Sequence, residues 1–200
     1  MIIKHLLKKR SWKKVTENQG NLYIISSVAG GGKSTLIDLL LRKHPEILFS
    51  VSYTSRPIRG GEKNGLNYHF ISKEEFEDLV VKNYFYEWAQ VHDNYYGTPK
   101  EFIEKNLKDG KKIILDIDVQ GADKVKASLP SCVSIFIVPP SREIWVERLK
   151  NRGTDDPQVI EKRIKNGLHE LEAQDRFDNR IVNNELMIAL GELESIILSK

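Results

Sequence analysis

The apolar residues of this chain fall into short runs that predict buried strands, separated by stretches with helical spacing. The runs at residues 21–27, 111–117 and 132–138 are almost continuously apolar, which is typical of strands covered on both faces. A shorter strand is expected at residues 180–182. Strands that alternate with helices predict an α/β fold with a parallel sheet flanked by helices. Helices are expected at residues 34–43, 99–109, from about 121, and at 142–151, 157–173 and 185–198.

The pattern changes after the first helix, where several short strands and a long polar loop follow one another. Ser72 and Glu75 form a capping box, with Ser72 as N-cap and Glu75 at the third helical position. The loop at residues 54–67 is rich in Gly and Arg, and loops of this length inside a compact domain tend to be functional. Strands are predicted at residues 48–53, 68–71 and 84–91, a helix at 72–82, and a turn at 92–94 that leads to 95–97. Thr98 is expected to cap the next helix, with Pro99 at its first position.

These elements divide the chain into a core and two additions. The strand-rich insert comprises residues 51–98, and two helices joined by a short turn at 141–165 are expected to form a helical lid. A basic extension, residues 1–19, precedes the first strand. The core is then made of residues 20–50, 99–140 and 166–200.

The turn between the first strand and the first helix resembles a phosphate-binding loop. In residues 27–34, which we call the phosphate loop, Gly32, Lys33 and Ser34 fit the pattern G-x-x-x-x-G-K-[ST], but Ser27 stands at the first glycine position. Such a turn presents backbone N–H groups and a helix N-terminus to phosphate, while Lys33 adds charge and the Ser34 hydroxyl can ligate Mg²⁺. The alternative is a plain glycine-rich turn. The interpretation predicts a nucleoside triphosphate site and a fold of the P-loop NTPase type.

Charge and cysteine content narrow the possible partners. The net charge is +3, but residues 1–19 hold six basic residues and one acidic residue, so the rest carries 25 basic and 27 acidic residues. This balance does not favour nucleic-acid binding, and no apolar run approaches the ~18 residues that span a bilayer. The extension lacks the features of a secretory signal. The single cysteine, Cys132, predicts a reducing compartment and hence a cytoplasmic location. Monomer and homo-oligomer both remain open.

Two arginines in the loop of the insert are candidates for binding a phosphate monoester. Arg56 and Arg59 lie three residues apart among glycines, and guanidinium groups bind phosphate oxygens bidentately. Tyr68 and Tyr96 can add phenolic O–H groups. A solvated basic loop is the alternative.

Three carboxylates are candidates for contacts with a nucleotide. Glu87 lies on a strand among aromatic residues, where it is either exposed at an edge or an acceptor for a base. Guanine offers N1–H and a 2-amino group side by side, which suits a carboxylate, whereas adenine offers no such pair. Asp116 and Asp118 follow a buried strand, where open α/β sheets bind ligands. One can hold Mg²⁺ and the other can reach the base, or both are helix N-caps.

Arginines gather in the predicted lid. Arg148 and Arg152 are four residues apart on one helix face, and Arg163 lies on the following helix. With Arg142 they form a set that can neutralise a transferring phosphoryl group. For each of them the alternative is a surface arginine paired with a nearby glutamate.

Taken together, these residues resemble the guanylate kinase family from about Gly20 onward. The resemblance is carried by residues 50–68, Glu87-Trp88-Ala89, residues 95–98, residues 116–121 and residues 148–153. It implies transfer of the γ-phosphoryl group of ATP to GMP, and to dGMP, with Mg²⁺ as cofactor. It implies ATP contacts by Val28, Ala29, Gly30, Gly31, Gly32, Lys33, Ser34, Thr35 and Asn183, and GMP contacts by Ser52, Arg56, Arg59, Tyr68, Glu87, Tyr96, Thr98 and Asp118. It implies catalytic roles for Lys33, Arg56, Arg148, Arg152 and Arg163, and metal contacts for Ser34 and Asp116.

The sequence departs from the family at Ser27, at residues 174–179 and in the basic extension. Two other functions fit the resemblance less well. A non-catalytic interaction module of this fold would usually lack Lys33 and the lid arginines. A kinase acting on another phosphate would not need Glu87 and its neighbours.

Overall fold

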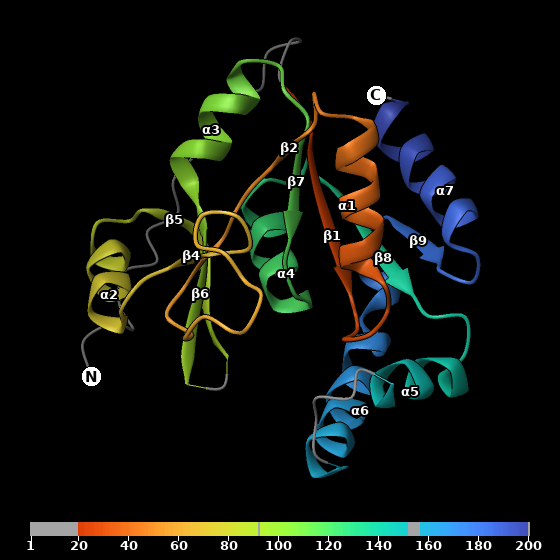
Figure 1. Ribbon diagram of the computed structural model, residues 1–200. Coiled ribbons are helices and arrows are strands. Elements are labelled where there is room, and N and C mark those ends of the chain that lie inside the picture. The colour runs from red at the N-terminus through yellow and green to blue at the C-terminus, as the bar shows by residue number, and fades with distance from the viewer. Residues whose placement is uncertain (1–19, 92, 152–156, 200) are drawn as a thin grey trace.

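The centre of the molecule is a five-stranded parallel sheet. The computed structural model describes residues 20–91, 93–151 and 157–199. The strands lie in the order β2-β7-β1-β8-β9, so the strand before the phosphate loop lies in the middle of the sheet (Figure 1). Their bounds are β1 (Leu22–Ser27), β2 (Leu48–Phe49), β7 (Ile113–Asp116), β8 (Val133–Val138) and β9 (Asn179–Val182). The predicted α/β fold is confirmed.

Helices cover both faces of this sheet because its strands are apolar on both faces. Tyr23 and Ile25 of β1 pack in the cluster formed with α1 (Lys33–Lys43) and α7 (Leu186–Leu198). Leu22 and Ile24, which alternate with them, pack with α3 (Lys100–Lys108) and α4 (Val119–Ser128). A third cluster, at the carboxyl end of the strands, joins Val28 to α5 (Arg142–Lys150), whose Trp145 is fully buried. The helix α6 (Pro157–Glu172) follows.

A second, mixed sheet stands beside the core, and its strand order is β4-β3-β6-β5 (Figure 1). The bounds are β3 (Tyr53–Thr54), β4 (His69–Phe70), β5 (Phe85–Val91) and β6 (Asn94–Pro99). The helix α2 (Lys73–Val81) begins with the predicted capping box of Ser72 and Glu75, and its Phe76 stacks on Phe85 and Tyr95. Lys124 of α4 donates to the carbonyl oxygen of Trp88 on β5. The insert is therefore a small body that contacts the core through α4.

Two local predictions were wrong, and a segment that was predicted only to follow a turn is a strand. The run 48–53 is two strands, because Phe49 pairs with Ile114 of the core sheet whereas Tyr53 pairs with Gly97 of the second sheet. Residues 95–97 are part of β6, which pairs with β5 as an antiparallel hairpin. Thr98 does not cap α3, since Pro99 is at the N-cap position and the Thr98 hydroxyl donates to Glu87 instead.

Candidate functional site

The phosphate loop leaves the centre of the sheet and ends at the first turn of α1. Gly30 and Gly32 have φ angles of 82° and 90°, a left-handed conformation that glycine adopts without steric cost. The N–H of Gly31 donates to the carbonyl oxygen of Val28 at 3.0 Å. Of the eight residues predicted to contact ATP here, Val28 to Gly32 form the turn and Lys33 to Thr35 form the start of α1. Ala29, Ser34 and Thr35 are exposed.

Asn183 closes the loop from the end of β9. Its Nδ2 donates to the carbonyl oxygen of Gly31 at 3.0 Å, and its side chain is buried. A cavity of about 340 Å³ lies beside this contact, lined by Gly30, Gly32, Thr35, Arg148, Asn183, Asn184 and Leu186. The structure thus brings Asn183 to the loop, and Asn184 and Leu186 join it in the lining of the cavity.

Ser27, which stands where the loop pattern has glycine, is hydrogen-bonded to the neighbouring strand. Its hydroxyl donates to the carbonyl oxygen of Ile137 on β8 at 2.8 Å. A Cβ atom on Gly31 would lie only 2.0 Å from the Ser27 Oγ. The serine side chain is accommodated because Gly31 has no side chain.

Lys33 and Asp116 meet at the carboxyl ends of two adjacent parallel strands. The Lys33 ammonium group contacts the Asp116 carboxylate, which follows from the pairing of β1 with β7. Burial lowers the pKa of Lys33 to about 8, and the carboxylates of Asp118 and Glu170 act in the opposite direction. The Lys33 side chain therefore lies beside the loop with carboxylates as its present partners. A bound phosphate group could replace them.

The oxygen donors near Lys33 fit the needs of Mg²⁺. The Ser34 side chain is exposed and the Asp116 carboxylate is partly exposed. Mg²⁺ prefers oxygen ligands and is commonly held by one or two protein groups plus substrate phosphates and water. Within the described ranges no group of three or more His, Cys, Asp or Glu side chains could hold a metal ion.

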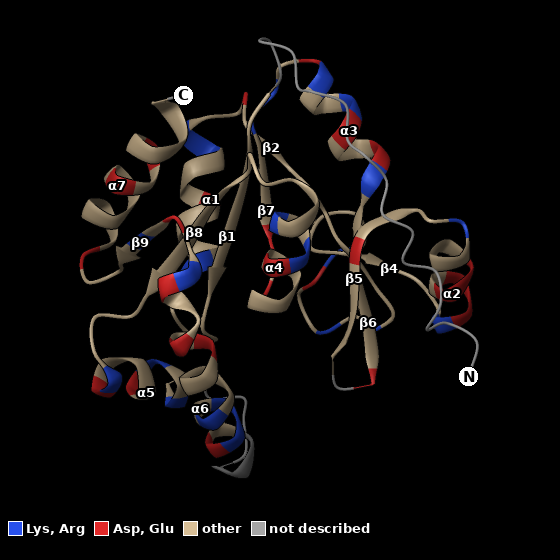
Figure 2. Ribbon diagram, turned by 180° about the vertical axis from the view of Figure 1, so that it is seen from behind, with Lys and Arg blue, Asp and Glu red and all other residues tan. Residues whose placement is uncertain are grey.

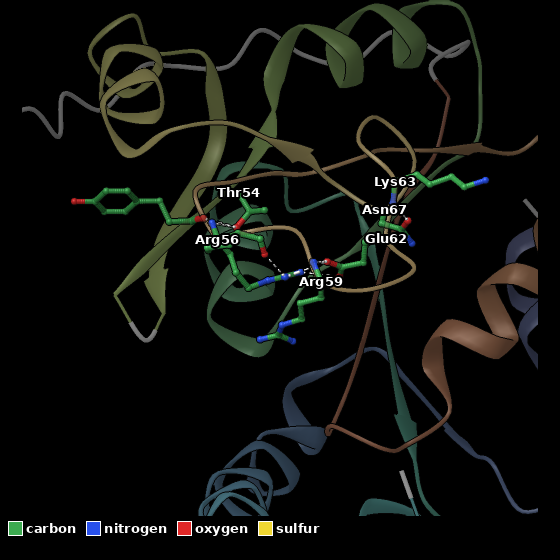
Figure 3. Close-up of polar contacts among 8 residues, drawn as sticks. Thr54, Arg56, Arg59, Glu62, Lys63 and Asn67 are labelled. Atoms are coloured by element: carbon green, nitrogen blue, oxygen red, sulfur yellow. Dashed lines mark hydrogen bonds and ion pairs between the residues drawn. The ribbon is translucent and has the colours of Figure 1, made fainter. Parts of the chain in front are cut away.

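The four residues predicted to bind the acceptor phosphate, Arg56, Arg59, Tyr68 and Tyr96, come from the second sheet and its long loop. Figure 3 shows the two arginines on the loop. Arg56 is 7% exposed. Its guanidinium carbon lies 5.6 Å from the centroid of the Tyr68 ring. The Glu62 carboxylate is the main cause that raises the pKa of Arg56, and the Tyr96 side chain acts in the same direction. The rings of Tyr68 and Tyr96 are in edge contact at 6.0 Å. The Arg59 side chain is exposed, and Figure 3 shows its guanidinium group extending from the loop.

Glu62 holds this cluster in place, a role that the sequence reasoning missed. Its carboxylate accepts from Arg56 Nη2 at 2.7 Å and Nη1 at 3.0 Å. It also accepts the backbone N–H of Arg59 at 2.7 Å. These bonds lower the pKa of Glu62, with the Arg56 hydrogen bond as the main cause. The sequence did contain a signal for this contact, because Glu62 follows Arg56 by six residues and two glycines lie between them.

Glu87 is a buried carboxylate on β5. It is 8% exposed, and its Oε1 accepts the hydroxyl of Thr98 at 2.8 Å. Burial raises its pKa, and the nearby Asp118 acts in the same direction. A Cβ atom on Gly121 would lie 3.4 Å from the Glu87 carboxyl carbon and 3.3 Å from Asp118 Oδ1. The first turn of α4 therefore brings Asp118 beside Glu87.

Asp118 and Ser52 complete the residues predicted to contact the base. Asp118 is the N-cap of α4, and its Oδ1 accepts the N–H of Gly121 at 2.7 Å. In this structure Asp118 therefore caps the helix, which was the alternative to a contact with the base. The carboxylate is still exposed. Ser52 is partly buried just before β3, and its carbonyl oxygen accepts the N–H of His69 at 2.8 Å.

The lid arginines are distributed over α5 and α6. Arg148 of α5 donates to the carbonyl oxygen of Asn183 at 3.2 Å, which places it at the cavity beside the loop. Arg163 lies on α6 and is partly buried. Arg142 is exposed at the start of α5. Arg152 lies outside the described residues. Figure 2 shows the lysines and arginines of α5 and α6 interspersed with acidic residues.

The fold and the site together indicate a class of protein. A phosphate loop at the centre of a parallel sheet, with a separate sheet that presents arginines and a buried carboxylate, is the arrangement of a P-loop nucleotide-binding protein with a second substrate site. No helix among the described residues is long and apolar enough to cross a bilayer.

The chain belongs to the guanylate kinase family, whose description it matches over residues 19–200. It is 45% identical over 186 residues to the guanylate kinase of Pseudoalteromonas translucida, covering 93% of this chain and 90% of the relative. It is 48% identical over 179 residues to that of Neisseria gonorrhoeae, covering 90% and 87%. A crystal structure of guanylate kinase from Anaplasma phagocytophilum matches with a TM-score of 0.75 and 33% identity, covering 92% of this chain and 87% of that chain.

Proposed function

We propose that this chain is an active guanylate kinase, which transfers the γ-phosphoryl group of ATP to GMP and releases ADP and GDP. Its family membership over residues 19–200 supports the reaction. The observation that carries the choice of substrate is the buried Glu87 carboxylate, held by the Thr98 hydroxyl beside Asp118. Burying a carboxylate costs free energy unless hydrogen-bond donors compensate for the lost water. A base with paired N–H donors provides that compensation, so the site favours such a base over others.

The donor nucleotide binds at the phosphate loop. The backbone N–H groups of the loop and the N-terminus of α1 surround the phosphates, and Lys33 exchanges Asp116 for phosphate oxygens. The cavity beside Asn183 and Arg148 receives the rest of the nucleotide. Ser34 and Asp116 would hold Mg²⁺, and the ion would offset the negative charge of the phosphates.

The acceptor nucleotide binds on the second sheet. Arg56, Arg59, Tyr68 and Tyr96 hold its phosphate, while Ser52, Glu87, Thr98 and Asp118 contact the guanine. GMP and dGMP present the same base and phosphate, so both are substrates. Glu62 and the Pro57 carbonyl oxygen accept three of the five N–H groups of Arg56, and they thereby orient the two N–H groups that remain for the phosphate.

Catalysis consists of positioning and charge neutralisation. The attacking phosphate oxygen is already anionic at neutral pH, so no strong general base is required. Lys33, Arg148, Arg152 and Arg163 neutralise charge on the γ-phosphoryl group. Water has to be excluded, since otherwise ATP would be hydrolysed. We infer that the insert (51–98) and the part of the lid (141–165) that follows α5 close over the core (20–50, 99–140, 166–200), while α5 itself stays packed against the phosphate loop. The single buried cysteine fits work in a reducing cytoplasm.

A coupled assay of ADP release with GMP, dGMP, AMP and UMP tests the function. Turnover with GMP and dGMP, and not with AMP or UMP, is expected. The Lys33→Ala variant should fold and lose most of its turnover. Phosphorylation of AMP or UMP at rates near that of GMP would refute the proposed substrate. Undiminished turnover in Lys33→Ala would remove Lys33 from the mechanism.

A further inference from the structure

The indole ring of Trp145 on α5 is packed against the phosphate loop. The side chain is fully buried, and its Nε1–H donates to the carbonyl oxygen of Ala29 at 2.7 Å. Leu149, one turn further along α5, lies 3.1 Å from the position that a Cβ atom on Gly30 would occupy. The loop is therefore seated on α5 by one polar and one apolar contact.

The hydrogen bond from Trp145 orients a peptide group of the loop. In a planar trans peptide, the carbonyl oxygen of one residue and the N–H of the next point in opposite directions. Holding the Ala29 carbonyl against α5 therefore turns the Gly30 N–H away from α5. Phosphate loops bind their ligand through N–H groups that converge on it. The Gly31 N–H is already bonded to the Val28 carbonyl, so the direction of the Gly30 N–H matters for the anion site.

Helix α6 is fitted to the same indole ring. A Cβ atom on Gly167 would lie 2.3 Å from Cζ2 and 2.7 Å from Cη2 of Trp145. Gly167 is thus the position at which α6 leaves room for the ring. Arg163 precedes Gly167 by four residues, so both lie on the same face of α6. The indole ring therefore connects the loop with the face of α6 that carries Arg163.

We propose that Trp145 is a positioning residue for ATP. It fixes the Ala29–Gly30 peptide of the phosphate loop in the orientation that binds phosphate, and it sets the distance between the loop and Arg163. This inference rests on the proposed function, in which the loop binds the triphosphate. The partners of Trp145 are 116 residues before it and 22 residues after it, so its role is a product of the folded structure.

Trp145→Phe tests the proposal because it removes the N–H donor and keeps an aromatic ring. We expect KM for ATP to rise about fivefold to tenfold, as expected for the loss of one buried hydrogen bond. KM for GMP should stay within about twofold, because Trp145 contacts the phosphate loop whereas the proposed GMP contacts lie on the second sheet and at the start of α4. Titration calorimetry with ATP in the absence of GMP should show the same weakening, independently of turnover.

Tyr23→Phe is the matched control. Tyr23 is also a buried aromatic residue, and its hydroxyl donates to a backbone carbonyl, that of Ile197 in α7, at 2.9 Å. Both substitutions should lower the melting temperature, but only Trp145→Phe should weaken ATP binding. Unchanged ATP binding in Trp145→Phe, or equal weakening in both variants, would overturn the proposal. A wild-type protein without activity toward ATP and GMP would instead refute the proposed function.

The fit between Trp145 and Gly167 gives a second test. Gly167→Ala should displace the indole ring and weaken ATP binding, with a lower melting temperature. In a Trp145→Leu background, which leaves the space empty, the same substitution should raise the melting temperature, because alanine favours the helix over glycine. Additive effects of the two substitutions would show that the ring and Gly167 are not coupled.

Discussion

At the scale of single residues, the serine at the start of the phosphate loop is compensated by a glycine four residues later. The Ser27 hydroxyl occupies the space that a side chain on Gly31 would need, and it is bonded to β8. Gly31 is not among the glycines with positive φ, so its backbone would accept alanine. The need for glycine at position 31 is therefore steric. It arises mainly from Ser27, with the Val28 carbonyl oxygen, 3.1 Å from the Cβ position, as a second and weaker restriction.

This explanation predicts a rescue. Gly31→Ala should destabilise the protein by about 1–3 kcal/mol, the usual cost of overpacking, and should raise KM for ATP. Ser27→Gly combined with Gly31→Ala should recover most of both losses, because the double variant removes the atom that the new methyl group meets. Thermal melting and ATP kinetics of the two single variants and the double variant measure the recovery of stability and of KM for ATP. A double variant as impaired as Gly31→Ala would contradict the explanation.

Glu87 offers a prediction about substrate choice. Glu87→Gln keeps the size of the side chain but replaces one acceptor oxygen with a donor NH₂ group, which opposes the N–H donors of guanine. Loss of such a matched contact can cost up to about 10⁴-fold in kcat/KM. We expect a large loss of kcat/KM for GMP with ATP binding retained. Initial rates with GMP, and calorimetry with ATP, measure the two effects, and near-unchanged GMP kinetics would exclude Glu87 from the base site.

The raised pKa of Glu87 adds a pH dependence. The carboxylate form accepts the guanine N–H groups, so kcat/KM for GMP should fall at acid pH, beginning above the range of an ordinary glutamate. A carboxyl group with a pKa raised on folding destabilises the fold above that pKa and no longer does so below both pKa values. Glu87→Gln should therefore melt at a higher temperature than wild type at pH 7, and this difference should shrink as the pH falls.

At the scale of elements, local patterns predicted the regular parts of the fold and long-range contacts decided the rest. The strand at 22–27, helix α1 and the capping box of Ser72 and Glu75 follow from signals within a few residues. The run 48–53 was mispredicted because its two halves pair with strands far along the chain. Thr98 carries a helix-cap signal, but its hydroxyl is used by Glu87, eleven residues away.

The same distinction applies to the site. The lysine, arginines and carboxylates that suit nucleotide phosphates and guanine were recognisable from residue type and spacing. The contacts that orient them were not, because they depend on the fold. Asn183 reaches the Gly31 carbonyl across 152 residues and Trp145 reaches Ala29 across 116. Glu62 is near Arg56 in sequence, but only the loop conformation directs its carboxylate to the guanidinium fork.

The loop of the second sheet can be tested through Glu62. Glu62→Ala removes the group that orients Arg56 and accepts the Arg59 N–H, so KM for GMP should rise about tenfold or more, as expected for loss of a charge-assisted bidentate contact. KM for ATP should be unchanged. Lys63→Ala is the control, because the bond of Lys63 to Asn67 is made by its backbone N–H and its side chain is exposed (Figure 3). A lower KM for GMP in Glu62→Ala would instead mean that the carboxylate competes with the substrate phosphate.

At the scale of the whole molecule, the two proposed substrate sites lie on two bodies, the core with its phosphate loop and the second sheet. The chain passes from the core sheet to the second sheet at residues 50–52 and returns after Pro99. A further contact joins the two bodies, because Lys124 of α4 donates to the Trp88 carbonyl oxygen on β5. Phosphoryl transfer requires the reacting atoms to come within about 3–3.5 Å. The second sheet is therefore expected to move toward the phosphate loop, turning about its contact with α4, when both substrates are bound.

Small-angle X-ray scattering should detect this closure as a smaller radius of gyration with GMP and a non-hydrolysable ATP analogue together. Glu87→Gln, with its weakened GMP site, should not contract under the same conditions. Hydrogen exchange should become slower in residues 51–98, while α5 stays equally protected in all states, because Trp145 and Leu149 already hold it to the loop. An unchanged radius of gyration would rule out closure. Strong changes in α5 would show that it moves with the lid, and would separate that helix from the core on which the loop is built.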